Sequence, residues 1–150
     1  MPANIAHFFT QHFDAPKRVL YRHYAQDQWS DVGIGDIRHF AERWQEAFRC
    51  EGLKAGDRVA ICARNGSAWV AVDQAALGLG LVVVPLYADD NADNVALCAQ
   101  PAPAPLLLAA PSRMADALGA LGGTYALPRI VVLRPEARDA ARGLEQFLPL

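Results

Sequence analysis

The sequence of 150 residues contains little cysteine, little lysine and no long apolar run. Its three cysteines, Cys50, Cys62 and Cys98, form no C-x-x-C pair, so we expect free thiols, not a disulfide framework or a zinc knuckle. Lysine occurs only at Lys17 and Lys54, and the 14 basic residues are mixed with 16 acidic ones. This pattern lacks the basic stripe that neutralises phosphates, which argues against a nucleic-acid partner.

Signals for export or for membrane insertion are also missing from the sequence. The N-terminus has no basic region followed by the apolar stretch of a secretory signal. The longest uncharged stretch, Gln74–Ala88, contains glycines and Pro85 and is shorter than the roughly 20 apolar residues of a membrane-spanning helix. With 53% hydrophobic and 20% charged residues, the composition is typical of a folded globular protein. We therefore expect a cytoplasmic protein without a transmembrane segment.

The N-terminal third predicts a helix, a hairpin and a second helix. The first helix is expected at about Asn4–Phe13, followed by extended segments at Val19–Tyr24 and Gln28–Val32 with a turn at Ala25–Asp27. Apolar residues at steps of three and four then place one face of an amphipathic helix in the core: Ile37, Phe40, Ala41, Trp44, Ala47 and Phe48. Asp36 suits the first turn of this helix, and Gly52 ends it.

Strand and helix patterns alternate from residue 58 onward. The expected strands are Arg58–Ala63, Leu81–Val84, Leu106–Ala110 and Arg129–Leu133. The expected helices are Ala68–Leu79, a segment from Asp90 or Asn91 to about Gln100, and Ser112–Leu121. Such alternation is typical of a mostly parallel sheet with crossover helices, so we assign the α/β class and leave the strand order open.

The alternating strands and helices also predict one buried strand and a single domain. The β-branched run Leu81–Val84, closed by Pro85, indicates a strand buried on both faces. The whole chain, residues 1–150, is interpreted as one domain, with a helix and hairpin over about 1–35 and an α/β portion over 36–150.

The glycines do not form a phosphate-binding loop. The pair Gly33 and Gly35 lacks the third glycine of a dinucleotide motif, and the pair Gly78 and Gly80 lies where a helix must end before a strand. The glycines near residues 119–123 have no lysine beside them. We interpret all of them as structural.

The turn at Asn65–Ser67 is the most promising binding candidate. It follows a strand and opens a helix, so its backbone N–H groups would lie at the carboxyl edge of the sheet, where α/β proteins bind anions. The simpler interpretation, which the residue types favour, is a helix cap by Ser67 or Asn65. Ser67 as a nucleophile lacks a G-x-S-x-G elbow. Tyr87, after the next strand, is expected at the same edge, and Asn65, Ser67 and Tyr87 are therefore weak binding candidates.

Neither the aspartates nor the histidines predict a metal site. Asp89, Asp90 and Asp93 lack the distal glutamate of a calcium loop, and carboxylates are favoured at a helix start without any ligand. The histidines are too scattered to share one metal ion, and we interpret them as surface or partly buried side chains: His7, His12, His23 and His39.

A longer sequence pattern resembles that of a known family. It begins with "GLKAGDRVAI", continues through isolated matching residues and ends with "VPLY". The matching residues are Gly52–Ile61, Asn65, Trp69, Ala75–Gly80 and Val84–Tyr87. From about Trp29 to the end, the sequence is similar to the N-terminal region of the AMP-forming acyl-CoA synthetases, which belong to the adenylate-forming enzymes. The continuation Tyr87–Asn91 resembles their long-chain fatty acid branch. "LPRIVVL" from Leu127 and "GLEQFL" from Gly143 fit the stretch before the family's ATP loop.

The resemblance implies the reaction of a larger parent protein. Family members join an acid to ATP, which gives an acyl-adenylate and pyrophosphate, and then pass the acyl group to coenzyme A. The resemblance places the Ser/Thr/Gly-rich ATP loop, the later adenine and ribose contacts and the catalytic lysine of the C-terminal domain beyond this segment. We therefore expect an N-terminal structural portion that is inactive alone and has no catalytic residue. ATP, Mg, coenzyme A and a fatty acid would belong to the parent, and the partners would be its ATP-loop subdomain and C-terminal domain.

An alternative function remains open at this point. The chain would then be a free-standing, non-catalytic binding or interaction module derived from the same fold, with a nucleotide, acyl-CoA or a ligase partner at the Asn65–Ser67 edge. In either case a sheet cut from a larger enzyme exposes apolar surface and an unpaired edge. We therefore expect the chain to form a homo-oligomer or to be less stable than its length suggests.

Overall fold

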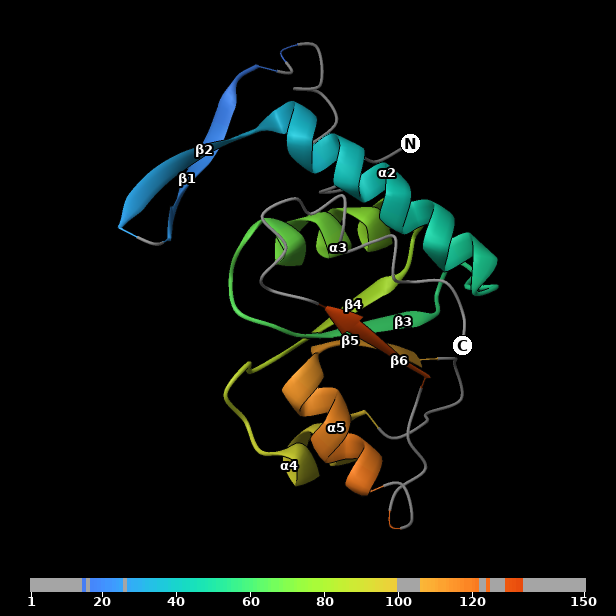
Figure 1. The fold of residues 1–150 in the computed structure, drawn as a ribbon. Helices are drawn as coiled ribbons and strands as arrows, with labels where there is room; N and C mark the ends of the chain where they lie inside the picture. Colours follow the sequence, from blue (N-terminus) through green and yellow to red (C-terminus); the bar gives the residue numbers. More distant parts are fainter. Residues whose placement is uncertain are drawn as a thin grey trace.

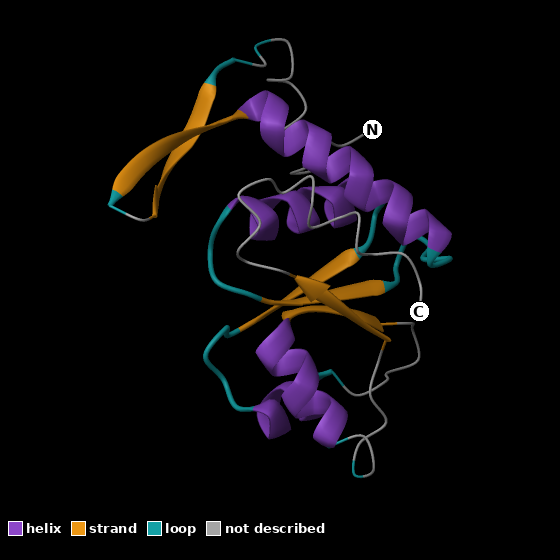
Figure 2. Cartoon of the chain, viewed as in Figure 1, coloured by secondary structure: helices purple, strands orange, loops and turns teal. Residues whose placement is uncertain are grey.

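The structure is a computed structural model, and it describes residues 15, 17–25, 27–99, 106–121, 124 and 129–133. These residues form a two-stranded antiparallel hairpin and a four-stranded parallel sheet with helices on both faces (Figures 1 and 2). The predicted α/β class is confirmed. The helix predicted at Asn4–Phe13 lies outside the described residues. None of the helices in the described part of the chain is long and apolar enough to span a lipid bilayer.

The hairpin consists of β1 (Val19–Ala25) and β2 (Gln28–Gly33) and confirms the sequence-based prediction. Its strands pair antiparallel, with Tyr24 opposite Trp29. Asp27, in the turn, has a φ of 58°, a conformation that aspartate tolerates better than most residues. The hairpin extends away from the rest of the described chain, beside the start of α2 (Figure 1).

Helix α2 (Ile34–Cys50) follows β2 without a linker. At its start, the backbone N–H of Gly33 donates a hydrogen bond of 2.9 Å to the Asp36 carboxylate, which confirms the acidic first turn. The predicted apolar face is also confirmed: Ile37, Ala41, Trp44 and Phe48 are buried, and Phe40 and Ala47 are partly buried.

A Schellman motif ends helix α2, as the position of Gly52 predicts. The N–H of Leu53 donates to the carbonyl of Phe48 at 3.1 Å, and the N–H of Gly52 donates to the carbonyl of Arg49 at 2.9 Å. Gly52 has a φ of 77°, the left-handed region in which a Cβ atom is unfavourable. Leu53 then packs against the cluster that contains Phe48, so the turn returns the chain toward the core.

The central sheet has the strand order β4-β3-β5-β6, and all neighbouring strands are parallel. Its strands are β3 (Arg58–Cys62), β4 (Val82–Leu86), β5 (Leu106–Pro111) and β6 (Arg129–Leu133). The helices between them are α3 (Ser67–Gly78), α4 (Ala92–Cys98) and α5 (Ser112–Ala120). Helices α2 and α3 lie on one face of the sheet, and α4 and α5 lie on the other (Figure 1).

The prediction that Leu81–Val84 forms a strand buried on both faces is wrong. β4 begins one residue later and lies at the edge of the sheet, where the Val82 side chain is 49% exposed. Pro85 lies inside the strand instead of closing it. Because the N–H of Val82 donates toward β3, to the carbonyl of Asp57, the alternation along the strand directs the nitrogen of Pro85 away from β3. An edge strand is where a residue without an N–H group is tolerated.

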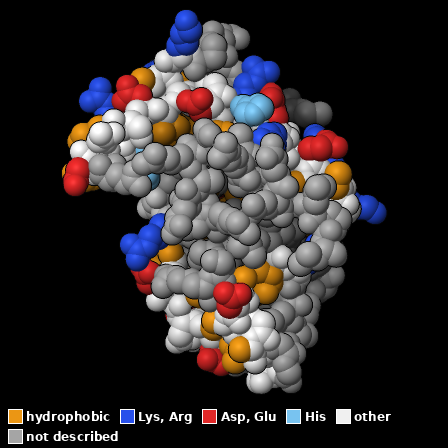
Figure 3. All heavy atoms as spheres, viewed as in Figure 1, with side chains coloured by type: hydrophobic (Ala, Val, Ile, Leu, Met, Phe, Trp, Pro, Cys, Tyr) orange, Lys and Arg blue, Asp and Glu red, His pale blue; other side chains and the backbone are white. Residues whose placement is uncertain are grey.

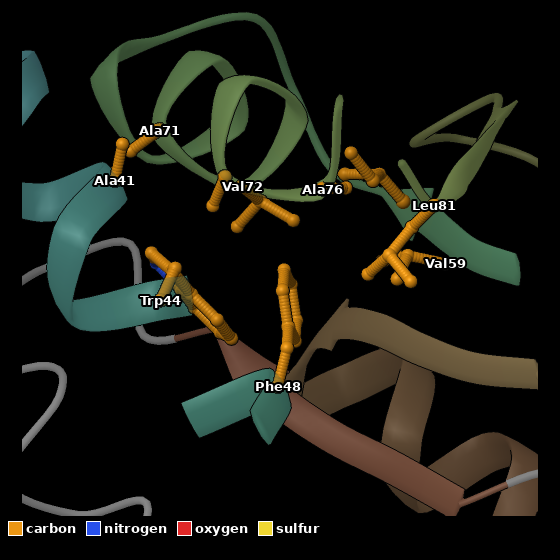
Figure 4. Close-up of a cluster of buried hydrophobic side chains, with 10 residues drawn as sticks. Ala41, Trp44, Phe48, Val59, Ala71, Val72, Ala76 and Leu81 are labelled. Atoms are coloured by element: carbon orange, nitrogen blue, oxygen red, sulfur yellow. The ribbon is translucent and has the colours of Figure 1, made fainter. Parts of the chain in front are cut away.

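Strand β3, by contrast, is buried on both faces. Val59 and Ile61 join the cluster under α2 and α3, whereas Ala60 and Cys62 join the cluster under α4 and α5. In the first cluster, Trp44 and Phe48 of α2 lie against α3, Val59 and Leu81 (Figure 4). The second cluster contains these buried residues: Ala60, Cys62, Val95, Ala96, Ala99, Met114 and Leu118.

Two glycine substitutions test this description with opposite expected signs. Gly52→Ala forces a Cβ into a left-handed conformation, so we expect the free energy of unfolding to fall by about 1 kcal/mol. In Gly119→Ala, inside α5, the added Cβ has no neighbouring atom within 4 Å. The better helix propensity of alanine should therefore raise the free energy of unfolding by about 0.5 kcal/mol. Urea denaturation of the three proteins measures both effects. If Gly52→Ala and the unsubstituted chain had equal free energies of unfolding, the role of Gly52 in the Schellman turn would be contradicted.

Candidate functional site

The carboxyl ends of β3 and β4 form the edge at which the candidate residues lie. The two strands are neighbours in the sheet, so the loops after them, residues 63–66 and 87–91, emerge side by side. Asn65 lies in the first loop, Ser67 starts α3, and Tyr87 begins the second loop. Asn65 is exposed, and the Tyr87 side chain is 85% exposed. The structure therefore places the three predicted candidates at one edge, in the region where α/β sheets bind ligands.

Two contacts join the loops of this edge to each other. The thiol of Cys62 donates to the carbonyl oxygen of Tyr87 at 3.4 Å. The Nη2 atom of Arg64 donates to both carboxylate oxygens of Asp89, at 2.8 and 3.1 Å. The ion pair links the two loops, but it is exposed, so its energetic contribution is small. No sequence pattern indicated Arg64, because its partner lies 25 residues away and no local signal links the two residues.

No disulfide bond joins Cys50, Cys62 and Cys98, so each keeps the thiol that the sequence predicts. Cys62 is buried, and the other two are exposed.

Asp90 and Asn91 stabilise the start of α4. The Asn91 side chain accepts a hydrogen bond of 2.8 Å from the N–H of Asn94, so the predicted cap at Asp90 or Asn91 is confirmed at Asn91. The Asp90 carboxylate accepts from the N–H of Asn91 and from the amide of Asn94, each at 2.9 Å. Among the described residues, no group of three histidine, cysteine or acidic side chains is placed to hold a metal ion.

The predicted capping of α3 by Ser67 or Asn65 is wrong. The N-cap is Gly66, which is in an extended conformation and has no side chain that could accept a hydrogen bond. Glycine is an acceptable N-cap residue because it leaves the first N–H groups of the helix accessible to other acceptors. Ser67 becomes the first helical residue and is half-buried.

Ser67 contacts the hairpin through Tyr21 of β1. Burial raises the pKa of the Tyr21 hydroxyl above its usual value of 10.0, and a weaker interaction with the Ser67 side chain acts in the opposite direction. The hydroxyl oxygen is inaccessible to solvent and has no partner at full hydrogen-bond geometry among the described residues. Ser67 therefore lies near the Tyr21 hydroxyl and is less accessible than Asn65 or Tyr87.

The substitution Tyr21→Phe tests this contact through its pH dependence. Near neutral pH the hydroxyl is protonated in both states, so its removal should change the free energy of unfolding by less than about 1 kcal/mol. Above pH 10.0 the unfolded chain ionises first, because the pKa in the folded state is raised. Above this pH the unsubstituted chain should lose stability that the Tyr21→Phe variant retains. Urea denaturation of both proteins at about pH 8 and about pH 11 measures this loss. If the free energies of unfolding of the two proteins differed by the same amount at both pH values, the burial of this hydroxyl would be contradicted.

Comparisons with known proteins agree with the fold and with the motif. A family model described as AMP-binding enzyme matches residues 9–145. The long-chain-fatty-acid–CoA ligases FadD15 of Mycobacterium bovis and of Mycobacterium tuberculosis are each 28% identical to this chain over 130 residues. The match covers 86% of this chain and 22% of either ligase, so the chain spans about a fifth of the length of these relatives.

Solved structures show the same fold at lower identity. Apo MatB from Rhodopseudomonas palustris is 18% identical with a TM-score of 0.77, over 97% of this chain and 28% of that one. A fatty acyl CoA synthetase from Mycobacterium tuberculosis is 19% identical with a TM-score of 0.72, over 96% and 28%. The inhibitor-bound N-terminal domain of FACL13, also from Mycobacterium tuberculosis, is 21% identical with a TM-score of 0.70, over 97% and 36%. On the family match over residues 9–145, the chain belongs to the AMP-binding enzyme family.

Proposed function

We propose that this chain is the N-terminal structural portion of an ATP-dependent, AMP-forming fatty acid–CoA ligase. The parent reaction joins a fatty acid to ATP, releases pyrophosphate, and then transfers the acyl group from the adenylate to coenzyme A. The observation that carries the proposal is the family match over residues 9–145. The long-chain fatty acid is proposed because both FadD15 relatives carry that substrate in their names.

The described edge does not fit ATP or Mg by itself. Its guanidinium group, on Arg64, already contacts both carboxylate oxygens of Asp89. The Asp90 carboxylate accepts hydrogen bonds from Asn91 and Asn94. Asn65 and Tyr87 offer neutral hydrogen-bonding groups, which orient a ligand or a neighbouring segment but do not neutralise a triphosphate. We therefore assign the binding of ATP, Mg and coenzyme A to other parts of the parent ligase.

In this proposal the chain positions two loops for the catalytic centre of the ligase. The body formed by α2, α3 and β3 holds the loops 63–66 and 87–91 at the carboxyl edge, and the Arg64–Asp89 pair links the two loops. Asn65 and Tyr87 then face the segments that complete the catalytic centre. In this proposal residues 1–150 belong to a single domain of the larger protein, with the hairpin and the α/β portion as its two parts.

The test compares the chain with the gene that encodes it. The 150-residue chain, assayed alone with ATP and a long-chain fatty acid, should show no ATP–pyrophosphate exchange above background. Sequencing of the coding DNA downstream of Leu150 should find a Ser/Thr/Gly-rich loop that ends in Pro-Lys. Saturable binding of ATP or acyl-CoA in a chemical-shift titration of the chain would contradict the proposal and would favour the free-standing binding module. A stop codon directly after Leu150 would do the same.

A further inference from the structure

Asn65 is followed by a glycine, unlike the other asparagines in the described part of the chain. The described asparagines and the residues after them are Asn65–Gly66, Asn91–Ala92 and Asn94–Val95. The side-chain amide of an asparagine is open to attack by the backbone nitrogen of the next residue. A following glycine hinders this attack least, because it has no Cβ atom. The sequence therefore sets Asn65 apart from the other two.

The side chains of these asparagines also differ in their hydrogen bonds. The Asn91 side chain accepts from the N–H of Asn94 at 2.8 Å, and the Asn94 amide donates to the Asp90 carboxylate at 2.9 Å. Both side chains are therefore held at the start of α4. The Asn65 side chain is exposed and forms no hydrogen bond with the residues that the structure describes. Its amide is free to turn toward the backbone nitrogen that follows.

That backbone nitrogen, in Gly66, is also available for reaction. Its N–H donates no hydrogen bond within the described part of the chain, and the residue lies in the loop before α3, with an extended φ of 169°. By contrast, the N–H of Val95, which follows Asn94, donates to the carbonyl of Asn91 at 3.1 Å. The nitrogen of Gly66 therefore changes its orientation without breaking a hydrogen bond of a helix or strand.

The loop that carries Asn65 lies at the surface. Figure 1 shows the connections after β3 and β4 on the left of the molecule, and Figure 3 shows basic and acidic side chains close together on that side. Water, which hydrolysis of a cyclic intermediate requires, therefore has access to this loop.

We propose that Asn65 is a site of spontaneous deamidation. The backbone nitrogen of Gly66 gives its proton to water or hydroxide and forms a bond to the Cγ atom of Asn65. The bond from Cγ to the side-chain nitrogen breaks, and that nitrogen takes up a proton and leaves as ammonia. The five-membered succinimide that results adds one water molecule. Ring opening at one carbonyl gives aspartate, and opening at the other gives isoaspartate.

Either product changes the candidate edge. A carboxylate replaces a neutral amide one residue before the N-cap of α3, where the helix dipole favours negative charge. Isoaspartate also lengthens the main chain between β3 and α3 by one carbon atom, so loop 63–66 takes a different path. The chemistry requires only this loop and water, so the inference does not depend on the proposed function.

The experiment follows the 150-residue chain during incubation in a mildly alkaline buffer. Peptide mass spectrometry should detect the mass gain of an amide that becomes an acid at Asn65. The same gain should appear at Asn91 and Asn94 at least about tenfold more slowly, a difference of about 1.4 kcal/mol in activation free energy. A methyltransferase specific for isoaspartate should label the peptide that contains residue 65.

Gly66→Ala is the matched control variant. The added Cβ hinders the attacking nitrogen but has no neighbouring atom within 4 Å, so the rate at Asn65 should fall by about tenfold or more. Alanine is a poorer N-cap residue than glycine, and circular dichroism checks that the variant remains folded. Asn65→Gln is a second variant, because a longer side chain closes the ring more slowly, and it should lose the isoaspartate label.

Three outcomes would overturn the inference. The first is an intact Asn65 after the folded chain has been incubated, with deamidation only in urea, because the folded loop would then protect this residue. The second is an equal rate at Asn65, Asn91 and Asn94. The third is an unchanged rate in a folded Gly66→Ala variant. Each outcome would leave the ligase proposal intact, because that proposal depends on the exchange assay and the downstream sequence.

Discussion

The close packing of α2 on α3 is the contact on which the rest of the described structure depends. The fully buried residues of helix α3 are small or β-branched: Ala71, Val72, Ala75 and Ala76. Small residues allow two helices to approach closely, and Trp44 and Phe48 of α2 fill the space that remains above β3 (Figure 4). The Schellman turn at Gly52 then directs the chain from the end of α2 into β3, so the turn and the core are consistent with each other.

This packing determines where the candidate edge forms. Because α3 is fixed against both α2 and β3, the loop between β3 and α3 has a defined position at the carboxyl end of the sheet. The loop after β4 is placed beside it by the parallel register of the two strands, in which Cys62 pairs with Leu86. The Arg64–Asp89 pair and the Cys62–Tyr87 contact add local definition to an arrangement that the core has already set. The hairpin, by contrast, depends on few contacts with this body.

Much of the fold was predictable because its signals are local. The periodicity of α2, the glycine that ends it, the hairpin strands and the strand Arg129–Leu133 were all predicted from short sequence patterns. The strand order was not predictable, because a pattern indicates the type of an element but not its neighbours. The same limit explains the error at β4, since a β-branched run looks alike in a central and in an edge strand, and only Pro85 indicated the edge.

The candidate site was predictable in position but not in detail. Asn65, Ser67 and Tyr87 lie at the expected edge, because a βαβ pattern places the residues that follow each strand there. The cap of α3 was mispredicted because Gly66 stands between two good capping residues, and the sequence does not show which of the three begins the helix. The Arg64–Asp89 pair and the Tyr21–Ser67 contact join distant segments, so no local signal indicated them.

A stable body of α2, α3 and β3 carries a weakly supported hairpin. Native-state hydrogen exchange of the 150-residue chain tests it most directly, because it resolves the opening free energy of each segment. The account predicts that the amides of β3, residues 59–62, exchange only by global unfolding, and that those of β1 and β2 exchange at least about a hundredfold faster through local opening. Equal protection of the hairpin and β3 would contradict the account, because the hairpin would then belong to the same cooperative unit as the core.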